Sequence, residues 1–456
     1  ADLNIRGGSS DENTIFWNGI NMYQSSHLFG LISAFNSKTV QEVKVMKNGS
    51  SAAYGSGVSG VIDMKTKFDD IQQAKYHFGI NLISADICTL LPISKRHHIQ
   101  VSARRSMTDF LKTETYNNYF KRISQNSDLL GINDENLYKN EVFFFNDFTF
   151  NYLFKISTKS ELQFNAIAIQ NSLTFDENDL EEESVIDLKS LLKQVTFGLS
   201  VNYHNLLSEN LKLSSNVYYS KFSMDAVNND VYNNQILKQG TTIIENGLKI
   251  NLNKKINNYF QSEIGYQFIE TGVGNLEKVN RPLFRRYEKL VLRTNALYNQ
   301  WSFKSKNNNT KLNFGWRLSY IDRFSKFILE PRFSFQQKLA NQLRLEILGE
   351  TKNQYTSQGV YFQNDFLGIE KRRWRLSNNS DIPILQSRQI SLGLHHNKNS
   401  WLSSVEGFYK SVEGLTTRSQ GFLNQYQFTD AIGQYYIYGV DFLLQKEWNK
   451  FKTWLT

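Results

Sequence analysis

The sequence predicts an all-β transmembrane barrel that follows a small, partial α/β unit at the N-terminus. Three observations support this fold class: long segments in which apolar and polar residues alternate, a regular succession of short and long connections, and glycine concentrated near the N-terminus. The composition agrees, since 33 Phe, 23 Tyr and only 4 Pro in 456 residues suit many long strands with few breaks.

Residues 1–72 are expected to form the N-terminal unit. Eight of the 26 glycines fall within the first 60 residues. Dense glycine between short apolar runs indicates tight turns and close approaches of the backbone. Within this unit the sequence predicts strands at 14–17, 43–46 and 60–64 and a short helix over 31–39.

Residues 73–456 are expected to form the barrel. Apolar and polar residues alternate in segments such as 161–168, 212–219 and 311–318. Alternation of this kind gives a strand one apolar and one polar face. The segments run longer than the about five or six residues of a typical sandwich strand. In a transmembrane barrel the apolar face meets lipid and the polar face lines the lumen, and we expect that arrangement here.

Short and mostly long connections alternate along the predicted barrel. Outer-membrane barrels show this parity because their periplasmic turns are short and their extracellular loops are long, whereas a sandwich or a propeller has no reason for it. Short polar turns are predicted at 157–159, 207–209, 254–256, 306–308, 339–341 and 397–399. The connections between them are predicted at 113–140, 176–187, 228–238, 274–283, 322–323, 353–386 and 414–433.

The same parity gives the number of strands. The run 76–93 is predicted to be a hairpin bent near Ser84 and Ala85, because only then does the turn at 94–96 lie on the short-turn side. Counting on gives sixteen strands by Trp448 and a seventeenth from Phe451. Bacterial barrels have even strand numbers, and those with a plugged lumen reach about 22. We therefore expect about 17 strands of a barrel of about 22, which is truncated at its C-terminal end.

Several other classes of protein are excluded. No run approaches the roughly 18 apolar residues of a membrane helix, which excludes a helical membrane protein. The single cysteine, Cys88, allows neither an intrachain disulfide nor a cysteine-based metal site. No nucleophile elbow, Ser/His/Asp arrangement or phosphate-binding loop is recognisable. We therefore expect neither an enzyme nor a cofactor.

No metal site is expected either. The adjacent histidines at 97–98 and 395–396 point to opposite faces of a strand, so neither pair converges on one ion. The acidic stretch 176–187 lacks the glycine-bearing spacing of a calcium loop. A solvated loop is the favoured interpretation of that stretch, and loose contact with divalent cations or a cationic partner is the alternative.

The charge of the chain favours solvated faces over a nucleic-acid patch. The net charge of +9 comes from 52 Lys and Arg against 43 Asp and Glu, scattered along strand-like segments. The basic run 371–375 resembles a nucleic-acid patch in composition. On an outer loop it is expected to meet lipopolysaccharide phosphates or an anionic ligand instead, so no nucleic-acid partner is expected. The N-terminus shows no signal-peptide pattern, so a leader is expected to be cleaved or not included.

Six segments of the N-terminal unit are distinctive: 5–13 (IRGGSSDEN), 17–19, 23–30, 35–36, 43–49 and 54–62. Together they resemble the plug domain of TonB-dependent outer-membrane receptors. Two barrel segments, 102–106 and 438–441, are similar to barrel positions of the same family. Trp17, Asn18 and Gly19 depart from the Leu-Asp-Gly that the family usually shows, so Asn18 supplies no carboxylate.

The resemblance implies active, TonB-dependent import of a scarce or bulky ligand across the bacterial outer membrane. In such receptors the plug fills the lumen, and the inner-membrane TonB complex pulls a segment before the plug, which we expect to be missing from this chain. The implied surroundings are outer-membrane lipid and lipopolysaccharide, and a surface lipoprotein is a candidate partner. One alternative is a binding or assembly component that uses the same fold without transport, and a passive porin is another. The ligand could be a siderophore, a vitamin, an oligosaccharide or a peptide.

Two groups of residues are candidate site residues. Tyr23, Gln24, Ser25, Ser26 and His27 are predicted to form a ligand-binding plug loop, because aromatic, amide, hydroxyl and imidazole groups together suit a polar ligand such as a sugar. The alternative for this loop is packing and hydrogen bonding against the barrel wall. Contacts between plug and barrel are predicted for Arg6, Arg104 and Arg105, and Arg6 is expected to pair with acidic residues of the wall rather than to bind ligand.

Overall fold

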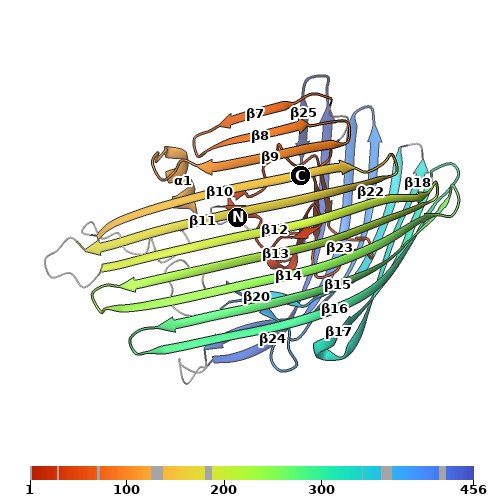
Figure 1. The fold of residues 1–456 in the computed structure, drawn as a ribbon. Helices are drawn as coiled ribbons and strands as arrows, with labels where there is room; N and C mark the ends of the chain where they lie inside the picture. Colours follow the sequence, from red (N-terminus) through yellow and green to blue (C-terminus); the bar gives the residue numbers. More distant parts are fainter. Residues whose placement is uncertain are drawn as a thin grey trace.

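The computed structural model describes residues 3–27, 30–68, 72–124, 137–179, 187–340, 342–360, 372–420 and 428–456. Within them, seventeen strands form one barrel sheet in chain order, and each strand runs antiparallel to the next along the chain (Figure 1). The strands are β7 (Lys75–Ile80), β8 (Ser84–Pro92), β9 (His97–Ser106), β10 (Leu137–Lys155), β11 (Ser160–Asp179), β12 (Asp187–Ser208), β13 (Leu211–Asp230), β14 (Gln235–Lys255), β15 (Phe260–Val279), β16 (Phe284–Lys304), β17 (Thr310–Ile321), β18 (Lys326–Ala340), β19 (Leu343–Gln354), β22 (Leu385–Lys398), β23 (Trp401–Gln420), β24 (Phe428–Glu447) and β25 (Lys452–Leu455).

The predicted number of strands is confirmed. The hairpin expected over 76–93 is present as β7 and β8, joined by a turn at 81–83. The six predicted short turns each join two consecutive barrel strands at the same end of the barrel. We call this end the short-turn end and the opposite end the long-loop end.

Side chains alternate across the wall as predicted. In β22, Ile390, Leu392 and Leu394 lie on the outer face and are 57%, 55% and 45% exposed, while Gln389 and Ser391, which alternate with them, are buried. A water-soluble sheet would bury the apolar residues instead. An apolar outside and a polar inside are the arrangement of a barrel that is surrounded by lipid.

Several predicted connections are too long. The connections expected at 228–238 and 274–283 shrink to 231–234 and 280–283, because the flanking strands continue through them. Strands β10–β16 have 19 to 22 residues, well beyond the about 9–11 residues that cross a bilayer. Beyond the membrane both faces of a strand meet water, so backbone pairing continues after the apolar alternation has stopped.

Two of the predicted connections contain structure of their own. Helix α1 (Glu114–Ser124) lies within 113–140. The hairpin of β20 (Thr356–Val360) and β21 (Arg372–Leu376) lies within 353–386. Most of the acidic stretch 176–187 lies outside the described residues. No helix in the described part of the chain is both long and apolar enough to cross a membrane.

The N-terminal unit is built on a four-stranded sheet with the order β2-β1-β6-β5. The pair β1–β6 is parallel and its neighbours are antiparallel. The predicted strands at 14–17, 43–46 and 60–64 are confirmed to within a residue. The elements of the unit are the 3-10 turn η1 (Ser10–Glu12), β1 (Thr14–Trp17), β2 (Ile20–Asn21), β3 (Ser26–His27), β4 (Ile32–Ser33), β5 (Glu42–Met46) and β6 (Val61–Lys65).

The helix predicted over 31–39 is wrong. The segment contains β4 and then a turn that Asn36 closes, since its side-chain oxygen accepts from the Lys38 backbone N–H at 2.9 Å. Asparagine offers the backbone such local hydrogen bonds in competition with a helix. The apolar residues Ala34 and Phe35 pack against Ile167 and Ile169 of the barrel, so tertiary contacts rather than helical periodicity place them.

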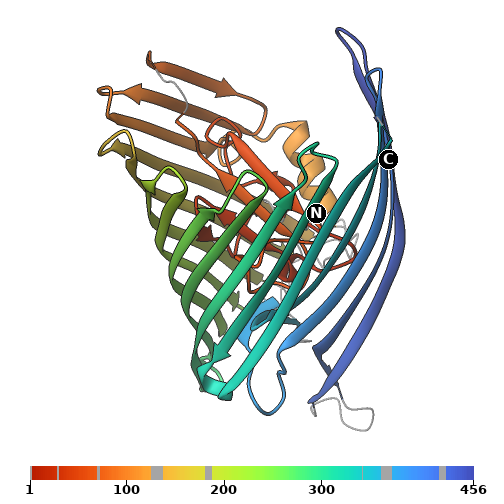
Figure 2. The ribbon, with the colours of Figure 1, turned by 90° about the vertical axis from the view of Figure 1, so that its right-hand side faces the viewer.

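The N-terminal unit lies inside the barrel, with the strands wrapped around it (Figure 2). Its side chains and backbone form hydrogen bonds with wall strands from β9 to β24. Trp17 and Ile20 are fully buried and share one apolar cluster with Ile167 and Tyr218 of the wall. The unit therefore folds against the lumen wall rather than around a separate core.

Candidate functional site

The candidate site is the interface between the N-terminal unit and the lumen wall. The contacts of the unit differ in chemical type between two parts of this wall. We call strands β17–β19 and β22–β24 the first wall, and strands β9–β15 the second wall. Charged side chains dominate the contacts with the first wall, whereas neutral amides, hydroxyls and backbone groups dominate those with the second.

Glu12 makes the central contact with the first wall. Its Oε2 lies 3.2 Å from Lys410 Nζ, and both side chains are buried. The hydroxyl of Tyr435 also donates to Glu12. Burial raises the pKa of Glu12 above its ordinary value, although Lys410 and Tyr435 act in the opposite direction. A buried carboxylate needs such partners, because an isolated charge is strongly disfavoured away from water.

A second buried network surrounds the loop 48–60. Glu350 accepts from the Ser50 backbone N–H at 2.9 Å and from the Ser50 hydroxyl at 2.6 Å. Arg332 donates to Ser50 Oγ at 3.0 Å and to the Ser51 carbonyl at 2.5 Å. Lys352 Nζ donates to the carbonyl of Ser59 at 2.9 Å. The three charged side chains of this network therefore bond to the backbone or a hydroxyl of the N-terminal unit.

Arg6 reaches the first wall from a tight turn. Arg6 and Gly7 both have left-handed backbones, with φ of 47° and 67°, and Ile5 pairs with Gly8 across the turn. The Arg6 guanidinium forms an ion pair with Glu406 of β23 and lies 4.6 Å from the centre of the Phe408 ring. A side chain at Gly7 would collide with Ile437, so glycine allows this close approach.

The second wall holds the turn at Asn18. Asn18 Nδ2 donates to Asn151 Oδ1 at 3.0 Å, and its carbonyl accepts from Ser200 Oγ at 3.0 Å. Its own Oδ1 accepts from the Thr66 backbone N–H at 2.7 Å, which ties the turn to the end of β6. These are neutral hydrogen bonds between short side chains.

Glu245 is the main acceptor on the second wall. It is buried in β14 and accepts from Asn21 at 3.0 Å, from Thr271 at 3.1 Å, and from the hydroxyls of Tyr23 and Tyr218. Among the described residues no cation lies within ion-pair distance of it. Burial, followed by the charge of Glu245, raises the pKa of Tyr23 well above its ordinary value, so this hydroxyl stays a donor.

The predicted ligand-binding loop lies against the second wall. Tyr23 bonds to Glu245 and packs edge-on against Trp374 at 5.0 Å. Gln24 is buried and accepts from Thr196 Oγ1 at 2.9 Å. His27 is fully buried between Asp147 at 3.2 Å and Asn171 at 2.6 Å and stacks on Phe145.

Ser25 and Ser26 of the same loop are half-buried. Ser26 pairs with Ser33 in the short β3–β4 ladder, and the Ser25 carbonyl accepts from the Ala34 backbone N–H at 3.0 Å. The side chains of Tyr23, Gln24 and His27 are thus engaged by the protein itself, and ligand contact by the loop residues stays a prediction.

Arg104 and Arg105 have different surroundings. Arg104 donates to Asp147 and to the carbonyl of Ser33, both at 2.6 Å, and so joins the wall to the N-terminal unit. Arg105 pairs with Asp109 at 2.7 Å and lies over the rings of Phe110 and Phe144. The structure therefore places Arg104 at the interface and Arg105 away from it. Neighbouring residues of a strand point to opposite faces, so only one of the two could face the lumen.

The β20–β21 hairpin folds into the lumen. The Trp374 carbonyl accepts from Asn275 of β15 at 3.0 Å, and Arg373 lies 3.7 Å from Glu277. The Gln358 backbone N–H donates to Asp11 of the N-terminal unit at 2.9 Å. The hairpin therefore lies over the long-loop side of the unit.

The inward fold of this hairpin corrects one prediction. Arg373, Trp374 and Arg375 are buried, so the contact with lipopolysaccharide phosphates expected of this run is wrong for these three residues. Lys371 lies outside the described residues. In the described part of the chain, no group of three or more His, Cys, Asp or Glu side chains is arranged to hold a metal ion.

Apart from Arg104, sequence reasoning missed the barrel side of the interface, including Glu245, Arg332, Glu350, Lys352 and Lys410. The only signal available in the sequence is that each is a charged residue on the polar face of an alternating strand. That signal places a side chain in the lumen, but it does not show which of the many polar lumen residues meets the N-terminal unit.

Comparisons with known proteins agree with this arrangement. Residues 1–62 match the family model described as TonB-dependent Receptor Plug Domain. No curated protein matches the chain in a sequence comparison. The chain is similar in structure to the siderophore receptor PirA from Pseudomonas aeruginosa, with 12% identity and a TM-score of 0.63, over 99% of this chain and 78% of that one.

Two further solved structures are similar. A variant of the ferric enterobactin receptor PfeA from Pseudomonas aeruginosa has 13% identity and a TM-score of 0.67, over 96% of this chain and 70% of that one. The outer membrane transporter YddB from Escherichia coli has 10% identity and a TM-score of 0.66, over 97% and 67%. Residues 1–62 thus match a TonB-dependent receptor plug domain, and the chain shares the fold of these solved outer-membrane proteins.

Proposed function

We propose that this chain, a TonB-dependent receptor by its plug domain and its barrel fold, imports a ligand across the bacterial outer membrane by an energy-coupled mechanism. The plug then comprises residues 1–72 and the barrel residues 73–456. The observation that carries the proposal is the plug inside the lumen, bonded to the wall on several sides. A ligand cannot pass such a lumen unless these contacts are released, and that release requires work.

The need to release the plug indicates which partner the receptor requires. The outer membrane has no nucleotide supply of its own, so the work has to arrive from elsewhere. We propose that the inner-membrane TonB complex supplies it through a segment that precedes the plug in the complete protein. Outer-membrane lipid and lipopolysaccharide are the expected surroundings of the barrel.

The solved neighbours are named as receptors for siderophores or ferric enterobactin, or as a transporter. This supports the import of a scarce ligand, and a siderophore is one candidate class for this chain. Vitamins, oligosaccharides and peptides are others. The runner-up function is a binding or assembly component that keeps the plug permanently closed, in which a surface lipoprotein would be the partner.

Uptake by a deletion strain tests the proposal. The parent, a deletion of the complete gene and a complemented deletion are grown in a mixed-nutrient medium, with and without a proton-motive-force uncoupler. The depletion of each compound is followed by mass spectrometry. A compound whose uptake is lost both on deletion and on uncoupling supports energy-coupled import. Loss on deletion alone would indicate a passive pore, and no difference for any compound would favour the binding or assembly role.

A further inference from the structure

Basic side chains gather on the outer face of the barrel, toward the long-loop end. Six of them, all exposed, come from the five consecutive strands β12 to β16, which lie side by side in the sheet (Figure 1). We call this group the basic patch, and its members are Lys193, Lys221, Lys238, Lys278, Arg285 and Lys289. Each of the five strands has both of its neighbours in the sheet, so the patch borders neither the plug nor an end of the chain.

Three members of the patch lie directly opposite one another. Lys238 of β14 pairs in register with Lys278 of β15, which pairs in turn with Arg285 of β16. Gln239 is buried and Glu277 meets the lumen hairpin, so the alternation of side chains directs the three basic residues outward. Like charges at directly opposite positions destabilise a sheet. The row is therefore unfavourable in the protein alone, and a bound anion would stabilise it.

The patch has little counter-charge of its own. In the part of the chain that the structure describes, no carboxylate lies within ion-pair distance of any of its six members. Asp225 is the carboxylate that faces outward among them, opposite Lys193 in register. Glu270, lower on the same face, pairs with Arg293 at 2.6 Å. Six positive charges beside a single unpaired carboxylate attract a molecule with several negative charges.

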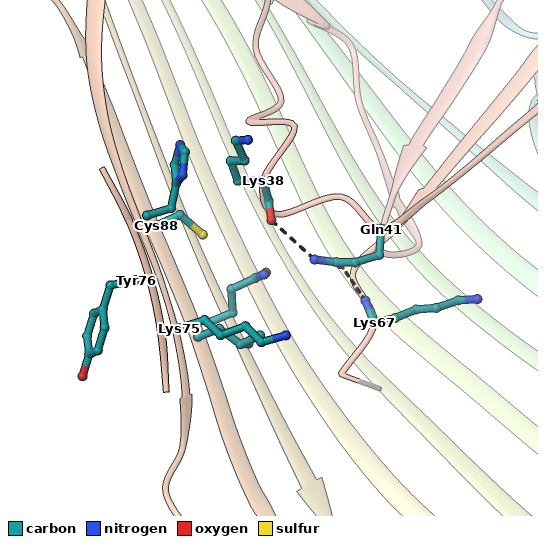
Figure 3. A pocket seen from close by; sticks show the side chains of 9 residues that line it. Lys38, Gln41, Lys67, Lys75, Tyr76 and Cys88 are labelled. Carbon is teal, nitrogen blue, oxygen red and sulfur yellow. Dashed lines mark hydrogen bonds between the residues drawn. The ribbon is translucent and has the colours of Figure 1, made fainter. Parts of the chain in front are cut away.

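The lysines inside the barrel are a separate group. Lys38 and Lys67 of the plug and Lys75 of β7 line a cavity of about 290 Å³ (Figure 3). No member of the basic patch lines this cavity. Because the cavity lies beside a plug that is only partial in this chain, its volume does not define a site.

The surface between the cations of the patch is formed by small residues. Gly272 and Gly274 of β15 and Gly240 of β14 face outward there, next to Thr242. The Tyr287 ring lies beside Gly274, since its hydroxyl oxygen would be 3.3 Å from a Cβ added to that glycine. Glycine within a strand often marks a place where another molecule approaches the backbone closely. Bare backbone beside an aromatic ring leaves room for a flat ring such as a sugar.

The height of the patch above the membrane indicates the kind of anion. On β15 the outer face is apolar or aromatic at Ile264, Tyr266 and Phe268 and first carries a charge at Glu270. Lys278 lies eight residues beyond Glu270, roughly 26 Å along the strand and roughly 18 Å along the membrane normal at a tilt of about 45°. The interfacial layer of a phospholipid bilayer adds only about 5–8 Å on each side. Phospholipid headgroups therefore end below this row.

We propose that the basic patch binds the phosphorylated inner sugars of lipopolysaccharide. This glycolipid carries phosphates on sugars that rise above the lipid headgroups, to the level of the patch. Lysine and arginine bind phosphate through charge-assisted hydrogen bonds. The contact with lipopolysaccharide that was expected of the run 371–375 thus falls to β12–β16 instead. The site anchors the receptor in its membrane and goes beyond the proposed import, since it depends on neither the imported ligand nor the energy source.

Binding of purified lipopolysaccharide tests the site. The complete receptor is purified in detergent and stripped of lipopolysaccharide, and its affinity for the fluorescently labelled glycolipid is measured. The triple variant Lys238→Gln, Lys278→Gln and Arg285→Gln is expected to bind at least tenfold more weakly, because the whole opposed row of charges is lost. All three side chains are exposed, so the variant is expected to fold, and the shift of the unheated barrel on a denaturing gel checks this.

The matched control removes the same charge from the same sheet at the short-turn end. It combines Lys254→Gln, Lys255→Gln and Lys304→Gln, three exposed lysines of β14 and β16. The control is expected to change the affinity less than twofold. If it weakens binding as much as the triple variant of the patch does, the net charge of the barrel is responsible and the proposal is overturned.

Other sources of phosphate are compared with lipopolysaccharide. Dephosphorylated lipopolysaccharide is expected to bind the wild type at least tenfold more weakly, and binding of phosphatidylglycerol is expected to be unaffected by the triple substitution. If phosphatidylglycerol or soluble polyphosphate binds the patch as tightly as lipopolysaccharide, the patch is a general anion site and the proposal fails.

A crosslink in living cells tests the same contact in the membrane. A photo-crosslinking amino acid replaces Tyr287, inside the patch, or Tyr259, in the short turn between β14 and β15. Illumination is expected to attach lipopolysaccharide at position 287 only, and the triple substitution is expected to reduce this adduct at least fivefold. No adduct at 287 in a folded receptor, or equal adducts at both positions, would contradict the site. Both experiments measure binding rather than uptake, so their failure leaves the proposed import standing, and a failure of import leaves the site standing.

Discussion

Single side chains of the barrel depend on the plug for their solvation. Lys352 and Lys410 are fully buried, and their ammonium groups find the Ser59 carbonyl and the Glu12 carboxylate only because the plug is in place. The same holds for Glu350, whose acceptor oxygen is used by Ser50. When the plug moves, water has to replace each of these partners. The plug can therefore separate from the first wall only if water enters the gap, because a dry gap would leave these charges buried without partners.

The substitution Glu350→Ala is expected to loosen the plug. It removes the acceptor of the buried Ser50 N–H and hydroxyl and leaves Arg332 with less counter-charge, which costs about 3–5 kcal/mol in comparable buried networks. The measurement is the urea concentration at which the plug becomes sensitive to protease. Glu42→Ala is the control, because its ion pairs with Lys44 and Lys67 are solvent-exposed and worth about 0–1 kcal/mol. Equal shifts in the two variants would contradict the role of the buried network.

The protonation of Glu12 gives the plug a pH dependence. Because the folded pKa of Glu12 is raised above its ordinary value of 4.5, the folded protein binds more protons than the unfolded chain above pH 4.5. The stability that the protonation of Glu12 contributes to the folded plug is therefore fully present below pH 4.5, and it is lost as the pH rises through the pKa of Glu12 in the folded protein. The urea midpoint of the plug is compared at several pH values in the wild type and in Glu12→Gln. If the urea midpoint changes with pH equally in the wild type and in Glu12→Gln, Glu12 is not the source of the pH dependence.

At the scale of elements, the β20–β21 hairpin is the clearest case in which context decides placement. Its sequence is basic and polar, and the pattern alone predicts an outer loop. The hairpin instead inserts Trp374 into an apolar cluster on the lumen side of the barrel, close to Tyr23 of the plug. Because the same hairpin bonds to Asp11 and to Asn275, it joins the plug to the second wall.

Truncation of Trp374 is expected to release this hairpin. Trp374→Ala removes a buried ring, and large-to-small changes at buried aromatic positions cost about 3–5 kcal/mol. Because the loss falls on one hairpin, protease cleavage within 356–376 is expected to accelerate tenfold or more while the barrel strands stay intact. Trp401→Ala is the matched control, since Trp401 lies exposed on the outer face at the short-turn end. Equal cleavage in both variants would show that Trp374 does not hold the hairpin.

At the scale of the whole molecule, the plug is bound unevenly to the barrel. Buried charged side chains of the first wall hold the loop 48–60 and Glu12, whereas most hydrogen bonds with the second wall join neutral groups. Neutral hydrogen bonds cost less to break than hydrogen bonds to buried charges. We therefore expect the path of the ligand to follow the second wall.

Disulfide locks test the direction of opening. An added Cβ at Gly198 would lie 3.0 Å from Ile20 Cγ2, so Ile20→Cys with Gly198→Cys is expected to fasten β2 of the plug to the second wall. An added Cβ at Gly315 would lie 3.1 Å from Ala52 Cβ, so Ala52→Cys with Gly315→Cys fastens the plug to β17. Both pairs are made in the complete protein with Cys88→Ser, and uptake is measured before and after reduction.

The disulfide to the second wall is expected to abolish uptake until the disulfide is reduced. The disulfide to β17 is expected to leave a substantial part of the uptake. The opposite order would place the path along the first wall. Complete loss in both locks would indicate that the plug leaves the barrel as a whole.

The sequence by itself determined the seventeen strands, the short turns, the lipid-facing residues and the plug resemblance. These features depend on local periodicity and on turn chemistry, which act over a few residues. Only the tertiary structure decided that 31–39 is not helical, that Arg104 rather than Arg105 meets the plug, and that the β20–β21 hairpin folds inward. It also brought Glu350 and Lys410 of the barrel into contact with the plug. These residues are far apart in the chain, and their distances depend on the tilt and register of every strand between them, which no local pattern specifies.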